Sequence, residues 1–131
     1  MQRCILCQSN KTALYYQDHN RRYCNCNTCG CVFIPHEALP KAKEEKERYL
    51  SHQNDVEDSG FQKFVSPMVN AIKAKHTTKE KGLDFGAGTG PVVSKLLEDF
   101  NYKMVLYDPF FHPNKDSLNN SYDFIVCCEV I

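Results

Sequence analysis

Two Cys-x-x-Cys pairs near the N-terminus constrain the fold of this chain more than any other feature. Cys4 and Cys7 form the first pair, Cys26 and Cys29 form the second, and 18 residues separate the pairs. Two cysteines three positions apart on a tight turn can point at one ion, and two such turns complete a tetrahedron of thiolates around Zn²⁺. The spacing therefore predicts a zinc ribbon around a closed structural site, with no open position for metal catalysis.

Two further cysteines leave the ligand set open. Cys24 and Cys31 flank the second pair and are alternative ligands, although only Cys26 and Cys29 keep the two-residue spacer. An iron–sulfur site or a reactive dithiol are the other chemistries that such a cluster supports. Disulfides are disfavoured, because the N-terminus lacks the apolar run of a secretion signal and cytosolic thiols stay reduced. We therefore expect a cytoplasmic protein.

The charge balance argues against two classes of partner. The chain has 131 residues, with 16 Lys+Arg and 16 Asp+Glu, so its formal net charge is zero. Nothing draws the chain as a whole to nucleic acid or an anionic membrane, although a local basic patch would still be compatible with nucleic acid. No apolar stretch approaches the ~20 residues of a membrane span.

Composition divides the chain into three zones, which we interpret as a zinc ribbon (1–35), a helical connecting region (36–80) and a strand–helix–strand segment (81–131). In the middle zone, 41–52 reads as an exposed helix. A second helix follows, which Asp58 or Ser59 can cap and in which Pro67 would remove a hydrogen bond and kink the chain. Its apolar face packs on a sheet or, as the alternative, covers a cofactor. That face comprises Phe61, Phe64, Val65, Met68, Val69 and Ile72.

A glycine-rich turn between a strand and a helix carries the main functional signal. The strand is 82–85, the glycines are Gly86, Gly88 and Gly90, and Pro91 opens the helix. Glycines let a backbone approach a nucleotide closely, and a helix N-terminus offers N–H groups. The dinucleotide fingerprint fails at Pro91, and the lysine of a phosphate loop is absent. A purely structural turn is the alternative. The apolar helix face comprises Val92, Val93, Leu96, Leu97 and Phe100.

Two more apolar runs predict neighbouring strands. The first, 103–107, ends at Asp108, whose carboxylate can accept both hydroxyls of a ribose. A turn-forming role for Asp108 before Pro109 is the alternative. The second run, 122–131, contains Cys127 and Cys128, which we interpret as small buried residues rather than ligands or nucleophiles.

These motifs together resemble class I S-adenosylmethionine-dependent methyltransferases that carry an N-terminal Cys4 zinc ribbon. The resemblance rests on the cysteine pairs and on the segments RYLSHQND, LDFGAGTG, LYDPFF and YDFIVCCEVI. It implies an α/β fold, a partial Rossmann-like parallel sheet with helices preceded by the small zinc ribbon. It also implies S-adenosyl-L-methionine as cofactor, structural Zn²⁺ on the four cysteines, and methyl transfer to an unidentified small or macromolecular acceptor.

The same resemblance assigns cofactor-binding residues but no general base. Phe110 or Phe111 would pack near the adenine. The residues implied to bind the cofactor are Asp84, Phe85, Gly86, Ala87, Gly88, Gly90, Asp108, Pro109 and Glu129.

The chain departs from this family's pattern in two places. Only 13 residues separate Asp108 from Tyr122, which leaves no room for the usual third strand with its helices, and the chain ends at Ile131, before the later strands. We expect a C-terminally truncated, cofactor-binding half without activity of its own. Its last strand should lie beside the first, away from the second, with an open edge that favours self-association. The alternative is a non-enzymatic ribbon that binds protein or nucleic acid, beside a remnant α/β domain.

Overall fold

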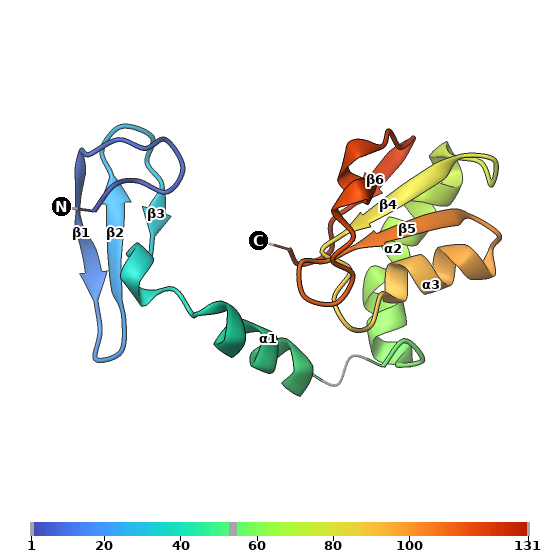
Figure 1. Cartoon of the computed structure of the whole chain (residues 1–131), viewed down its shortest axis with the longest axis horizontal. Coiled ribbons are helices and arrows are strands. Elements are labelled where there is room, and N and C mark those ends of the chain that lie inside the picture. The colour runs from blue at the N-terminus through green and yellow to red at the C-terminus, as the bar shows by residue number, and fades with distance from the viewer. Residues whose placement is uncertain (1, 53–54, 131) are drawn as a thin grey trace. The chain divides into compact units, whose positions relative to one another are not determined.

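A computed structural model describes residues 2–52 and 55–130 and divides the chain into two compact units, 1–45 and 46–131 (Figure 1). Helix α1 (Ala42–Ser51) begins in the first unit and ends in the second. The three zones drawn from composition remain a prediction. Among the described residues, no helix is long and apolar enough to cross a membrane.

The first unit is a three-stranded antiparallel sheet with the order β1-β2-β3, formed by β1 (Thr12–Gln17), β2 (Arg22–Cys26) and β3 (Val32–Phe33). In the β1–β2 turn, the Asp18 carboxylate accepts hydrogen bonds from the N–H groups of Asn20 and Arg21, both at 2.7 Å. The buried apolar cluster of this unit contains Phe33 and three cysteines, Cys4, Cys24 and Cys26. Because this core is so small, the unit depends strongly on its cysteine turns for stability. A short 3₁₀ helix, η1 (His36–Ala38), follows β3.

The two helices expected between the ribbon and the sheet are present. Helix α1 has no buried residue, as predicted, and Glu44 accepts a hydrogen bond from the Lys41 N–H at 3.0 Å in its first turn. Helix α2 (Ser59–Lys75) begins after Asp58, whose carboxylate accepts the Phe61 N–H at 2.8 Å. The cap is therefore Asp58 rather than Ser59.

Proline 67 lies inside α2 without ending it. A helical residue at this position would normally donate its N–H to the carbonyl of Lys63, four residues earlier, and proline has no N–H to donate. The hydroxyl of Ser66 donates to that carbonyl instead, at 2.8 Å. The side chain beside the proline thus gives that carbonyl a hydrogen bond in place of the missing backbone bond, and the helix continues through Pro67.

The apolar face of α2 is narrower than predicted. Val65, Val69 and Ile72 are buried, but 60% of Phe64 is exposed, so its assignment to the core face was wrong. Phe64 lies about 100° around the helix from Val65. Its ring stacks on the ring of Phe61, with centroids 5.8 Å apart. The buried face of α2 thus contains Val65, and Phe64 lies beside this face, toward solvent.

The second unit contains a parallel sheet with the order β5-β4-β6 (Figure 1). Its strands are β4 (Lys81–Phe85), β5 (Lys103–Tyr107) and β6 (Phe124–Val126), and Leu83 pairs with Val105 on one side and Ile125 on the other. The last strand therefore lies beside the first and away from the second, as predicted. Helix α3 (Val92–Asp99) connects β4 to β5. A 3₁₀ helix, η2 (Lys115–Asn119), and no further strand connects β5 to β6 among the described residues.

One hydrophobic core joins α2, α3 and the sheet. Val69 of α2, Leu97 of α3 and Val126 of β6 belong to the same buried cluster. Phe100 was predicted to join it, but this residue is the C-cap of α3 and is 48% exposed. The ammonium group of Lys73 lies 3.2 Å from the centroid of the Phe100 ring. The predicted apolar face of α3 was therefore wrong at its last position.

Strand β6 is shorter than the predicted run 122–131, whose last residue, Ile131, lies outside the described residues. It ends at Val126, and Cys127 is exposed, so the expectation that Cys127 is buried was wrong. Cys128 is half-buried. Glu129 has a left-handed backbone conformation with φ of 54°, which no strand residue adopts. The chain therefore turns at the carboxyl end of β6 instead of extending the sheet.

Candidate cofactor pocket and metal centre

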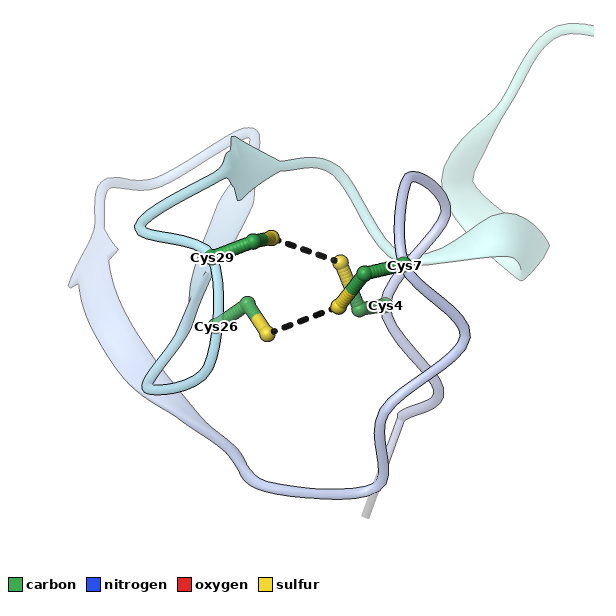
Figure 2. A group of neighbouring side chains, drawn as sticks. All are labelled: Cys4, Cys7, Cys26 and Cys29. Atoms are coloured by element: carbon green, nitrogen blue, oxygen red, sulfur yellow. Dashed lines mark hydrogen bonds between the residues drawn. The ribbon is translucent and has the colours of Figure 1, made fainter.

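The structure brings together the four cysteines that the sequence pairs predict. The side chains of Cys4, Cys7, Cys26 and Cys29 point toward one another from two turns (Figure 2), and their sulfurs all lie within 4.8 Å of one another. The Cys4–Cys29 and Cys7–Cys26 sulfur separations are both 3.6 Å. Zn–S bonds of ~2.3 Å would set sulfurs ~3.8 Å apart in a tetrahedron. The cluster therefore has the dimensions of a Cys4 zinc site.

The two cysteine turns have the same backbone geometry. In the first, the N–H of Gln8 donates to the carbonyl of Cys4 at 3.0 Å, and in the second the N–H of Gly30 donates to the carbonyl of Cys26 at 2.8 Å. Gln8 and Gly30 both have left-handed conformations, with φ of 61° and 73°. Because each turn closes four residues after its first cysteine, both cysteines of a pair project to the same side.

The electrostatics of the cluster favour bound cations. Burial raises the pKa of the Cys26 thiol, but backbone N–H groups and the Cys7 side chain outweigh it and bring the pKa to about 6. A backbone N–H lowers the pKa of Cys7, but neighbouring thiols and burial raise it to about 12. The pKa of Cys4 is also lowered, by backbone N–H groups above all. In each 3.6 Å pair one thiol, Cys4 or Cys26, has a lowered pKa, and a divalent cation would replace the protons of the four thiols.

The two alternative ligands lie outside the cluster. Cys24 is buried on β2 and belongs to the small apolar core of the ribbon. Cys31 is half-buried, and burial, followed by the nearby thiol of Cys4, raises its pKa. The geometry thus supports the predicted choice of Cys26 and Cys29.

In the second unit, the glycine turn after β4 is fastened to the end of β5. The N–H groups of Gly86 and Ala87 both donate to the carbonyl of Tyr107, at 2.8 and 3.0 Å. Gly86 and Gly88 have left-handed conformations, with φ of 79° and 63°. A Cβ on Gly88 would meet no atom within 4 Å, so the missing side chain leaves open space for a ligand beside the turn.

Asp108 performs the turn-forming role that was the alternative to ribose binding. Its Oδ1 accepts the N–H groups of Phe110 and Phe111 at 2.8 and 3.0 Å, and its Oδ2 accepts the N–H of Gly88 at 3.0 Å. Only 8% of Asp108 is exposed. The carboxylate is therefore adjacent to the glycine turn and is held there by backbone donors.

Asp84, near the end of β4, is a buried carboxylate beside the pocket. Its Oδ2 accepts a hydrogen bond from the Ser94 hydroxyl of α3 at 2.7 Å. Burial raises its pKa, against the opposing effects of that hydrogen bond and of the His112 charge. Ser94, which sequence reasoning missed, lies in the first turn of α3.

A pocket lies beside the glycine turn and collects six of the nine residues that the sequence assigned to the cofactor. Phe85, Asp108 and Pro109 do not line it. Phe85 stacks instead on Tyr107, with ring centroids 5.4 Å apart, and Pro109 is exposed. The predicted residues that line the pocket are Asp84, Gly86, Ala87, Gly88, Gly90 and Glu129.

Other lining residues were not predicted. Tyr49, near the end of α1, and His52, which follows the helix, line the pocket together with Phe61 of α2 and Cys128. Sequence reasoning treated α1 as a solvated helix, although the segment RYLSHQND, which contains Tyr49 and His52, carried part of the family resemblance. Phe110 and Phe111, expected near an adenine, lie outside this pocket with their ring centroids 6.2 Å apart.

Comparison with known proteins decides the family. The family model of a methyltransferase domain matches residues 34–131. The chain belongs to this methyltransferase family. No curated protein and no solved structure matches the chain. The matched region of the methyltransferase contains α2, α3, the parallel sheet and the glycine-turn pocket, while the four-cysteine cluster lies N-terminal to it.

Proposed function

We propose that this chain binds S-adenosyl-L-methionine in the glycine-turn pocket and supports methyl transfer from it to an acceptor. The single observation that carries the proposal is the pocket itself, because the turn after β4, a buried acid and the turn after β6 meet at the carboxyl ends of parallel strands. Ligands of open α/β sheets bind at that edge. The family match supports the reaction class.

The cofactor would supply a methyl group on a sulfonium, and the protein would hold the cofactor in place for the transfer. The open space over Gly88 would admit the ligand next to the backbone. Asp108, adjacent to that turn, would accept a hydroxyl of the ribose with the one lone pair of Oδ2 that its backbone donors leave free. Alignment of the acceptor with the methyl group accounts for much of the rate in such a displacement.

Calorimetry with S-adenosylhomocysteine, the demethylated product, tests this function without knowledge of the acceptor. We expect saturable binding with one site per chain. No heat at millimolar ligand would contradict the proposal and would favour the ribbon as a module that only binds other macromolecules.

We also propose that the cysteine cluster holds one structural Zn²⁺. The 3.6 Å sulfur pairs and the matched turn geometry support it. Four thiolates complete a tetrahedron, so the ion would have no position left for substrate and would stabilise the ribbon alone. Metal analysis of the purified chain should find one zinc per molecule.

A further inference from the structure

The end of helix α1 contributes a wall to the pocket, and the function proposed above gives it no role. Tyr49 and His52 line the pocket, and the His52 N–H donates to the Tyr49 carbonyl at 3.2 Å, which continues the last turn of the helix. Lys46 lies one turn earlier, with its ammonium group 5.9 Å from the centroid of the Phe111 ring. Residues three apart are neighbours along one side of a helix. This side of α1 thus extends from the loop after β5 to the pocket.

The order of the strands indicates which end of the cofactor this pocket receives. Asp108 follows β5, Glu129 follows β6, and β4 with its glycine turn lies between them. The pocket is lined by Glu129 and not by Asp108. If the ribose is bound at Asp108, as the proposed function holds, the opposite end of the cofactor extends toward β6. That end is an α-amino acid with an ammonium and a carboxylate.

The charged side chains that line the pocket can be paired with the two charges of this amino-acid end. Asp84 and Glu129 supply carboxylates, which suit the ammonium. Among the described lining residues there is no lysine or arginine, and His52 is the one side chain that can carry a positive charge. The Tyr49 hydroxyl, in the last turn of α1, is a second donor. A carboxylate in this pocket therefore finds its side-chain donors at Tyr49 and at His52, the residue that follows α1.

We propose that His52, assisted by Tyr49, binds the carboxylate of the cofactor's amino-acid end. The proposal rests on the proposed function and adds a binding role for a helix outside the glycine turn and the sheet. It makes the end of α1 part of the cofactor site instead of a solvated surface.

Two ligands that differ only at the relevant end test this assignment. S-adenosylhomocysteine carries the amino-acid end, whereas 5′-methylthioadenosine has the same nucleoside and thioether without it. We expect His52→Ala to weaken S-adenosylhomocysteine binding about tenfold or more, as for a hydrogen bond to a charged group, and to leave methylthioadenosine binding unchanged. Tyr49→Phe should show the same selectivity with a smaller loss, and His52→Gln, which keeps an N–H donor, should recover part of the affinity.

Leu50→Ala is the matched control, because Leu50 lies between the two residues on α1, is 58% exposed and does not line the pocket. It should change neither affinity. An equal loss for both ligands in His52→Ala would mean that His52 shapes the pocket, and an unchanged S-adenosylhomocysteine affinity would remove it from the site. Either result overturns the assignment. A wild-type chain that binds neither ligand would overturn the proposed function itself, so the two failures are distinct.

Discussion

The carboxylate of Asp108 accepts a hydrogen bond from the backbone N–H of Gly88 at 3.0 Å, across 20 residues of sequence. Its other oxygen accepts two N–H groups of its own loop. One side chain therefore holds the turn after β4 and the turn after β5 in a fixed relation. A binding site built from both turns depends on this carboxylate even before a ligand arrives.

Replacing Asp108 should affect stability and ligand binding together. We expect Asp108→Ala to lower the free energy of unfolding by about 1–3 kcal/mol, because three backbone donors lose their acceptor, and to weaken S-adenosylhomocysteine binding by about 1.5–3 kcal/mol. Urea unfolding and calorimetry measure the two effects. Asp108→Asn, which keeps one oxygen, should lose less stability. Lowered stability with unchanged affinity would leave Asp108 as a turn former alone.

The two left-handed glycines should respond differently to alanine. Both substitutions strain the backbone, by about 1 kcal/mol for a positive φ. At Gly86 the new Cβ would also come within 2.6 Å of a methyl carbon of Val130, whereas at Gly88 it would enter open space. Gly86→Ala should therefore lower the free energy of unfolding by about 1–3 kcal/mol more than Gly88→Ala. Gly88→Ala should instead weaken S-adenosylhomocysteine binding. Equal losses of stability in urea would contradict the packing argument.

Local spacing was enough to predict much of this molecule. The spacing within each cysteine pair predicted a tight turn, and the presence of two such pairs predicted that the four sulfurs share one site. The strand–glycine–helix pattern likewise predicted β4 and α3. Errors arose where neighbours decide the outcome. Phe64 and Phe100 are as apolar as core residues, but the packing of α2 and α3 leaves them at the surface.

Other features had no local signal. The continuation of α2 through Pro67 depends on a side-chain hydrogen bond from Ser66, which no propensity expresses. Strand β6 ends at Val126, and Glu129, three residues later, has a left-handed conformation that the apolar run did not indicate. His52 follows a charge-rich helix with no apolar stripe, so its place in the pocket depends on the tertiary path of the chain.

The zinc content of cysteine variants distinguishes the predicted metal ligands from the neighbouring cysteines. Cys26→Ala should abolish stoichiometric zinc and unfold the ribbon, because removal of a structural ligand typically removes the fold that the metal holds. Cys24→Ala is the matched control, since Cys24 lies two residues away on β2, is buried and is outside the cluster. This variant should keep one zinc per chain, as measured by mass spectrometry of its metal content. Loss of zinc in Cys24→Ala with retention in Cys26→Ala would reverse the ligand assignment.

The buried carboxylate of Asp84 should make stability depend on pH. Burial raises its pKa above the usual 3.8, so the folded chain holds this proton more tightly than the unfolded chain. Stability from this group is then fully present below the usual value and is lost as pH rises to the raised one, with a slope of at most about 1.4 kcal/mol per pH unit. Asp84→Asn cannot ionise and still offers an oxygen to the Ser94 hydroxyl. Relative to wild type, this variant should therefore gain stability as pH rises through that window.

Urea unfolding of the wild type and of Asp84→Asn in buffers from about pH 3 to about pH 7 measures the difference in their free energies of unfolding. The contributions of titrating groups that both proteins share cancel in this difference. Asp116→Asn provides the comparison, because Asp116 is an exposed carboxylate of η2. The pocket gives the result a functional meaning. Burial makes the charged form of Asp84 unfavourable, and a positively charged ligand group nearby would offset that cost. S-adenosylmethionine should therefore raise the stability of the wild type more than that of Asp84→Asn. A pH-independent difference between Asp84→Asn and wild type would mean that the buried acid keeps its usual affinity for protons and that this source of ligand attraction does not exist.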